Sequence, residues 1–341
     1  MPTQWIECKL EMCLKEKLKD AFPNNQAKID SIYSDYISIR SKAIEISRNI
    51  QKEEPTLTDH SPIHIANVMD NAYRLVEENI NSLNYAELYF LCVIIMLHDV
   101  GNIEGRSNHQ NKVTEIYNEI RAKKACYNTE RKHVLNAISA HSGEIKQGDK
   151  DTLRYLSESV NLLDNNLRLR DLASILRFAD ELAEGPQRTC DYLIKHGKYV
   201  IEKDGEEDGS ALIYQVYANI VEVFIDKDRI SISYDIDVKL KEIQDTGIDN
   251  LLMFVYKRII KLDEERRYCK YYTHLLDSFK HTYIVFNINC DGTPIDIGIP
   301  DIKLEDKFNV SANPNNSLET FLKQYPQLEI ESILNQIQNT L

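Results

Sequence analysis

Proline is absent from a long stretch in the middle of the chain, between Pro62 and Pro186, and only five glycines occur there. Proline and glycine are the residues that most disfavour a helix interior, and apolar residues recur through this stretch with helical spacing. We therefore expect a bundle of helices here. A helical pattern from Cys8 to about Gln51, interrupted near Pro23, precedes it.

Two short segments predict where helices of this bundle begin and end. Before Pro62, either Asp59 or Ser61 can cap a helix, and the proline suits its first turn. The apolar run 88–97 predicts a buried core helix that is too short to cross a membrane. Gly101 follows this run and suits a residue that turns the chain away from the helix end.

The composition changes after Pro186. The segment 213–225 is rich in β-branched and aromatic residues, and 230–236 alternates, so the two predict a β-hairpin. We further expect a helix over 248–277, a strand over 282–289, a loop over 311–317 and an amphipathic helix over 330–337. The predicted fold is mainly α, with a helical bundle followed by a smaller α+β portion.

Charge and cysteine content limit the classes of partner. The net charge of −13 disfavours nonspecific binding to duplex nucleic acid or to an anionic membrane. It leaves room for a small phosphorylated ligand, because a metal ion can supply local positive charge. The seven cysteines form no CxxC pair, and the N-terminus carries no secretory signal, so we expect reduced thiols in a cytoplasmic protein.

Histidine and aspartate residues occupy five sites of the helical region where the pattern directs a side chain inward. They are His64, the pair His98 and Asp99, His109, His141 and Asp180. Mn²⁺, Fe²⁺ and Zn²⁺ accept imidazole nitrogen together with carboxylate oxygen, and helical bundles can hold such ions in their cores. One inward histidine is more often a packing residue than a ligand. Five such sites in this order favour a metal site.

Five motifs in this region resemble a known family. They are TDHSPIH (58–64), LHDVGN (97–102), RSNH (106–109), ISAHSG (138–143) and LRFADELAEGPQR (176–188). Together they resemble HD-domain metal-dependent phosphohydrolases, and most closely the HD domains of bacterial conflict systems, called HD-CE. On this basis we divide the chain into an N-terminal helical segment (1–55), an HD metal-binding domain (56–195), an α+β portion (196–300) and a C-terminal loop and helix (301–341).

The resemblance implies a set of metal ligands. His64, His98, Asp99 and Asp180 match the basic set, and His109 and His141 match the extra histidines of the two-metal branch. The implied cofactor is one or two divalent ions, among Mn, Fe, Mg, Zn and Ni. His60 lies one helical turn before His64, so either could be the first ligand, and the continuing helix favours His64.

One departure from the family concerns catalysis and another concerns the substrate. Asn102 stands where many relatives have methionine or lysine, so the chain lacks a catalytic lysine expected there. The sequence after His141 lacks the glycine-tyrosine-proline signature of the cyclic-di-GMP branch, which argues against that substrate.

Basic residues near the motifs are candidates to contact the substrate. Arg106 and Arg188 could hold phosphate oxygens. Arg188 and Lys132, with Asp99, are the predicted catalytic residues, the two basic side chains offsetting charge on the leaving side. An alternative for Arg188 is an ion pair with Asp180 or Glu184.

The resemblance predicts hydrolysis of a phosphoester or phosphoanhydride by metal-activated water, most plausibly in a nucleotide and in an anti-phage or stress system. Two alternatives remain: a diiron HD-type oxygenase with the same ligand order, and a catalytically silent module for sensing or partner binding. The expected partners are a small phosphorylated substrate and either a second copy of the chain or a defence-system protein.

Overall fold

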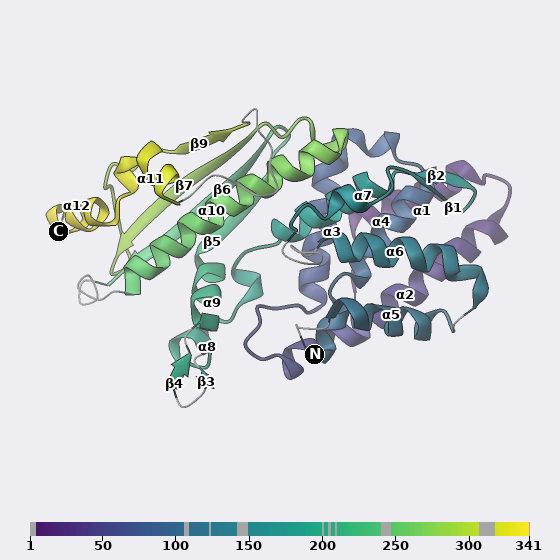
Figure 1. Ribbon diagram of the computed structural model, residues 1–341, viewed down its shortest axis with the longest axis horizontal. Coiled ribbons are helices and arrows are strands. Elements are labelled where there is room, and N and C mark those ends of the chain that lie inside the picture. The colour runs from purple at the N-terminus through teal and green to yellow at the C-terminus, as the bar shows by residue number, and fades with distance from the viewer. Residues whose placement is uncertain are drawn as a thin grey trace. The chain divides into compact units, whose positions relative to one another are not determined.

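The computed structural model describes residues 5–105, 109–122, 124–141, 149–199, 201–203, 206–208, 210–239, 247–306 and 318–340. The chain forms two compact units. The helical unit comprises residues 1–183 and 269–277, and the sheet unit comprises 184–268 and 278–341. The predicted fold class, mainly α with a smaller α+β portion, is confirmed (Figure 1).

Helices dominate the helical unit. Its described elements are α1 (Lys9–Ala21), α2 (Gln26–Glu53), α3 (Pro62–Val76), η1 (Glu77–Ser82), α4 (Tyr85–Leu97), η2 (Val100–Glu104), α5 (His109–Ile120), η4 (Ala125–Tyr127), α6 (Asn128–His141), η6 (Leu153–Tyr155), β1 (Val160–Leu162), β2 (Asn165–Leu167), α7 (Leu169–Glu181) and η8 (His274–Leu276).

Helix α4 forms the centre of the helical unit. All thirteen of its residues are buried, and it packs against α1, α2, α3, α6 and α7. The segment Tyr85–Glu104, which contains α4 and η2, is long and apolar enough to cross a membrane, but it is mostly buried inside the protein. A helix has this composition when every side of it faces other helices.

The predicted helix boundaries around Pro23 and Pro62 are confirmed. The first helix ends before Pro23, and α2 begins three residues after it. The hydroxyl of Ser61 accepts a hydrogen bond from the Ile63 backbone N–H, so Ser61 caps α3 and Pro62 occupies its first position.

The prediction that Gly101 turns the chain away after α4 is wrong. The chain continues through Gly101 as the 3₁₀ helix η2, in which the Asn102 N–H donates to the Asp99 carbonyl. This 3₁₀ helix ends at Gly105, whose φ of 93° lies in the region that favours glycine.

The sheet unit combines one five-stranded sheet with several helices. Its described elements are η7 (Pro186–Arg188), α8 (Asp191–Lys195), β3 (Ile201–Lys203), β4 (Glu206–Asp208), α9 (Ser210–Ile220), β5 (Val221–Ile225), β6 (Arg229–Val238), α10 (Gly247–Tyr272), β7 (His281–Cys290), β8 (Thr293–Ile295), β9 (Ile302–Glu305), α11 (Leu318–Gln324), η9 (Pro326–Leu328) and α12 (Ile330–Thr340). The last turn of α10 belongs to the helical unit.

The five strands of the main sheet follow the order β5-β6-β7-β8, and β9 also pairs with β7. Strands β5 and β6 form the antiparallel hairpin that the sequence predicts. Strands β6 and β7 are parallel and are connected through α10, which lies along the sheet (Figure 1). The ring of Tyr256 on α10 contacts Phe286 on β7, so this helix covers the apolar face of the sheet.

The first predicted strand of this hairpin begins too early. Residues 213–220 are part of helix α9, and only 221–225 form the strand. Tyr217 of α9 packs against Tyr234 and Phe254, so tertiary contacts override the strand propensity of the segment. The predicted strand over 282–289 and the C-terminal helix are confirmed, whereas the predicted loop 311–317 lies outside the described residues.

Candidate metal centre

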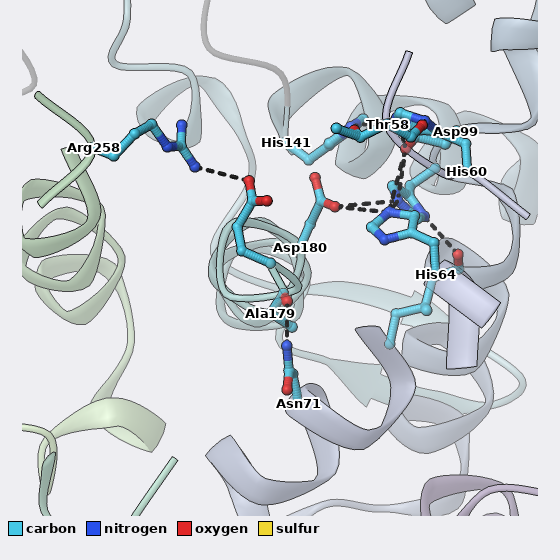
Figure 2. Close-up of polar contacts among 12 residues, drawn as sticks. Thr58, His60, His64, Asn71, Asp99, His141, Ala179, Asp180 and Arg258 are labelled. Carbon is cyan, nitrogen blue, oxygen red and sulfur yellow. Dashed lines mark hydrogen bonds and ion pairs between the residues drawn. The ribbon is translucent and has the colours of Figure 1, made fainter. Parts of the chain in front are cut away.

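Four of the predicted ligands converge in the helical unit. One donor atom from each of His64, His98, Asp99 and Asp180 lies within 4.8 Å of the others. Figure 2 shows Asp180 and His64 pointing toward each other, with Asp99, His60 and His141 close by. We call the four converging residues the HD cluster. Residues more than a hundred positions apart in the sequence therefore meet at one place.

Three structural elements bring the HD cluster together. His64 is the third residue of α3, directly after the Ser61–Pro62 start. His98 and Asp99 follow α4 without a break, where the buried helix passes into η2. Asp180 is the second-last residue of α7, which packs against α3, α4 and α6. The site is thus assembled by the packing of the core helices themselves.

Backbone carbonyls fix the orientation of three imidazole rings around the cluster. The Nδ1 of His98 lies 2.7 Å from the Ile95 carbonyl oxygen. The Nδ1 atoms of His141 and His60 pair in the same way with the carbonyls of Ile138 and Thr58. A carbonyl oxygen only accepts, so each Nδ1 carries a proton, and in a neutral ring the Nε2 then offers a lone pair. Metal-binding histidines are commonly held this way.

Donor separations in the HD cluster fit a shared cation. The Nε2 atoms of His64 and His98 lie 3.3 Å apart. From Asp180 Oδ1, the Nε2 of His64 lies at 3.2 Å and that of His98 at 3.5 Å. Two ligands at about 2.1 Å from one ion are about 3.0 Å apart at a right angle and about 3.4 Å apart at the tetrahedral angle. The residues therefore fit a divalent metal.

The distances from the Asp99 oxygens to the surrounding imidazole nitrogens are similar. Its Oδ2 lies 3.2 Å from His98 Nε2 and 3.6 Å from His64 Nε2. It also lies 3.5 Å from His60 Nε2, while the other oxygen, Oδ1, lies 3.9 Å from His141 Nε2. The two oxygens of Asp99 thus face different imidazoles. This is the arrangement of a carboxylate that can serve two neighbouring cations.

Without a metal, the buried charges of this site shift one another's pKa values. Burial would raise the pKa of Asp99, but the charge of His98, hydrogen bonds from His64 and His98 and the charge of His60 together hold that pKa well below its usual range. The pKa of Asp180 is likewise lowered against its burial by hydrogen bonds from His64 and His98. Burial opposes protonation of His98, yet the charge of Asp99 and the bond to Asp180 raise its pKa well above the ordinary value. One proton thus occupies the position that suits a metal ion.

His141 behaves differently from His98. Burial, followed by repulsion from protonated His98, lowers the pKa of His141. Its ring lies edge-on to that of His98, with the ring centroids 5.4 Å apart. A neutral imidazole at this position is the form that can bind a cation on the Oδ1 side of Asp99.

The structure does not bring every predicted site residue to the HD cluster. Lys132 is exposed on α6, and its position nine residues before His141 places it on the opposite side of that helix. Arg188 is buried in η7 and belongs to the sheet unit. The backbone of His109 begins α5, but its side chain lies outside the described residues, as does all of Arg106.

His60 is a member of this site that the sequence left undecided. Its side chain is 13% exposed and faces Asp99. Residue spacing could not settle its role because His60 precedes α3, where helical periodicity assigns no face. The signal that could have found it is the turn sequence Thr58-Asp59-His60-Ser61, in which short polar side chains fix the backbone before the helix.

A family model described as HD-CE matches residues 54–246, which is more than half of the chain. No curated protein and no solved structure is significantly similar to the chain. The matched region contains every residue of the HD cluster, and it agrees with the resemblance carried by the five sequence motifs.

Proposed function

The chain belongs to the HD-CE family, and on that premise we propose that it is a metal-dependent phosphohydrolase acting on a nucleotide. The bond it cleaves is a phosphoester or phosphoanhydride. The observation that supports this proposal is the meeting of His64, His98, Asp99 and Asp180 within 4.8 Å. We further propose that the chain acts in a bacterial defence or stress system, alone or with a partner chain.

The residues of the site have distinct roles in this proposal. His64, His98 and Asp180 would hold one cation, and Asp99 would contact it through Oδ2. His141, facing Oδ1 of Asp99 at 3.9 Å, would hold a second cation together with His109. Bound divalent ions would lower the pKa of coordinated water and polarise a phosphoryl oxygen of the substrate.

The protein orients the donor atoms and leaves one side of the site open to solvent. Carbonyl bonds at Nδ1 hold the rings of His98 and His141 with Nε2 toward the carboxylates. His98 is fully buried and Asp180 keeps a quarter of its side chain exposed, so substrate and water would approach from the Asp180 side. Arg106 and Arg188 are the proposed phosphate contacts. Lys132 is left out of this role because it is exposed on the opposite side of α6 from His141.

The test is to measure metal content and nucleotide turnover on the same preparation. The purified full chain is analysed for bound metals and then assayed with Mn²⁺ against a panel of nucleoside triphosphates, cyclic nucleotides and alarmones. The double variant His98→Ala/Asp99→Ala is assayed in parallel. We expect phosphate or nucleotide products from the wild type and none from the double variant. Unchanged turnover in the variant would refute the site.

The same experiment separates the other readings of this site. Oxygen consumption by the iron-loaded protein without phosphate release would indicate an oxygenase. Bound metal with neither activity would indicate a sensing or partner-binding module. Either result would replace the phosphohydrolase assignment while leaving the metal site in place.

A further inference from the structure

His60 is held by the segment that starts α3. The carboxylate of Asp59 accepts hydrogen bonds from the Ser61 backbone N–H at 2.9 Å and from its hydroxyl at 2.6 Å. The Ser61 hydroxyl in turn accepts from the Ile63 N–H at 3.1 Å. The backbone is therefore fixed on the C-terminal side of His60, and its position does not depend on a flexible loop.

The ring of His60 presents an acceptor to another acceptor. Its Nδ1 pairs with the Thr58 carbonyl and therefore carries a proton. In the neutral ring, Nε2 then has a lone pair, and this atom lies 3.5 Å from the carboxylate oxygen Asp99 Oδ2. Two acceptors at this separation repel each other unless a second ring proton or a shared cation lies between them.

Two separations place the ring of His60 beside the HD cluster, although its donor atom does not lie within 4.8 Å of all four cluster donors. Its distance to Asp99 Oδ2 lies between the 3.2 Å of His98 and the 3.6 Å of His64. Its ring centroid lies 5.4 Å from that of His64, the same separation as between His64 and His98. Like His98, it is oriented by a carbonyl two or three residues earlier in the chain.

We propose that His60 is a ligand of the cation bound by the HD cluster, so that His60 and His64 both bind it. This inference rests on the metal site of the proposed function. A set of three imidazole nitrogens and two carboxylates favours Mn²⁺, Fe²⁺, Co²⁺, Ni²⁺ or Zn²⁺ and disfavours Mg²⁺, which prefers oxygen ligands. His60 thus makes the site selective for transition metals.

The experiment measures metal binding by the full chain after removal of bound metal with a chelator. Co²⁺ is titrated into the wild type, His60→Leu and His60→Asp, with the visible absorption of Co²⁺ and the binding heat as readouts. His274→Leu is the matched control because His274 is fully exposed in η8 of the same unit. Mg²⁺ is titrated in parallel.

We expect His60→Leu to weaken Co²⁺ binding by about 100-fold or more, since even residues behind a ligand affect affinity by 10- to 100-fold, and to change the absorption spectrum. His60→Asp retains a donor, so it should bind Co²⁺ more tightly than His60→Leu and should improve the relative affinity for Mg²⁺. His274→Leu should match the wild type.

Two outcomes distinguish failure of this inference from failure of the proposed function. Wild-type affinity and spectrum in His60→Leu would overturn the role of His60 and leave the HD cluster intact. A wild-type chain that binds no Co²⁺ would overturn the metal site as a whole.

A measurement on the unsubstituted chain covers the case in which His60→Leu does not fold. In protein labelled with ¹⁵N at histidine, Zn²⁺ should shift the His60 Nε2 resonance toward that of a coordinated nitrogen. A His60 resonance that stays at the position of a doubly protonated ring would show an ion pair with Asp99 and overturn the proposal.

Discussion

Two buried polar clusters of the helical unit differ in how their charges are balanced. In one, the carboxylate of Glu130 accepts hydrogen bonds from the hydroxyls of Tyr89 and Tyr117 and from the guanidinium of Arg121, at 2.9, 2.5 and 2.8 Å. Every one of these partners is a donor. In the HD cluster, the carboxylates of Asp99 and Asp180 face imidazole nitrogens, of which His98 is oriented to offer a lone pair.

This difference separates a structural cluster from a functional one. The Glu130 cluster is complete by itself, because a permanent cation and two hydroxyls satisfy the carboxylate. The HD cluster is balanced only when a proton or a metal ion enters it. Burial of charge is common to both, so the shortage of donors is the feature that indicates function.

The largest effect is expected from changing a carboxylate of the HD cluster. Asp99→Asn removes the charge that faces both His98 and His141, so we expect loss of bound metal and a fall in turnover of about 1000-fold or more, as for other major electrostatic groups. Elemental analysis and a nucleotide hydrolysis assay measure the two effects. Glu130→Gln is the matched control, and equal losses in both variants would contradict the comparison.

The second-largest effect is a loss of stability when the Glu130 cluster is changed. Glu130→Ala leaves the buried guanidinium of Arg121 without its main partner, so the free energy of unfolding should fall by about 3–5 kcal/mol. Urea unfolding followed by circular dichroism measures it. Metal affinity of the folded variant should equal that of the wild type. A weaker metal affinity would mean that the two clusters are coupled.

Metal binding should stabilise the wild type by a smaller amount. At a free metal concentration of about 100 times the Kd, the gain is about 2.7 kcal/mol, because the ion binds the folded chain and not the unfolded one. Thermal unfolding with Mn²⁺ and with a chelator gives the difference. Asp99→Asn should show no such difference, and a wild type insensitive to both additions would contradict the metal site.

The metal-induced stabilisation should increase with pH. The pKa of His98 in the metal-free chain is raised above its ordinary value, so the stability from its protonation is complete below the unfolded pKa and is lost as pH rises through the folded one. Metal binding must displace that proton, so the apparent metal affinity should rise about tenfold per pH unit below the folded-state pKa of His98. Thermal shifts at about pH 6 and about pH 7.5 test this. A larger shift at the lower pH would contradict it.

The smallest effect is expected at Lys132. This side chain is exposed on the opposite side of α6 from His141, so Lys132→Ala should change turnover and metal affinity by less than about twofold, as for an ordinary surface substitution. Steady-state kinetics measure it. A tenfold loss would restore Lys132 as a catalytic residue and would show that substrate reaches this side of α6.

Much of the helical unit was predictable because its signals are local. The break near Pro23, the start at Ser61 and Pro62, and the apolar run before His98 each depend on a few neighbouring residues. The convergence of the HD cluster followed from helix faces and motif order. The late start of the first strand of the hairpin did not, because Tyr217 is held in a helix by residues distant in sequence.

Other features gave no usable signal. The hairpin of β1 and β2 turns at Leu163 and Asp164, both with positive φ and neither a glycine, so the glycine that most clearly marks such a turn is missing. The orientation of His60 depends on a carbonyl bond in a segment without periodicity. Sequence patterns report which face a helical residue occupies, but not how a side chain in a turn is directed.

The complete burial of α4 has a consequence for how this protein can change over evolutionary time. Since every side of that helix is packed, the positions of His98 and Asp99 depend on the packing of the whole core. A substitution such as Leu91→Ala would therefore disturb the site two helical turns away, although Leu91 is not itself a ligand. We therefore expect substrate preference to change through exposed residues near Asp180, while the sequence of α4 is retained.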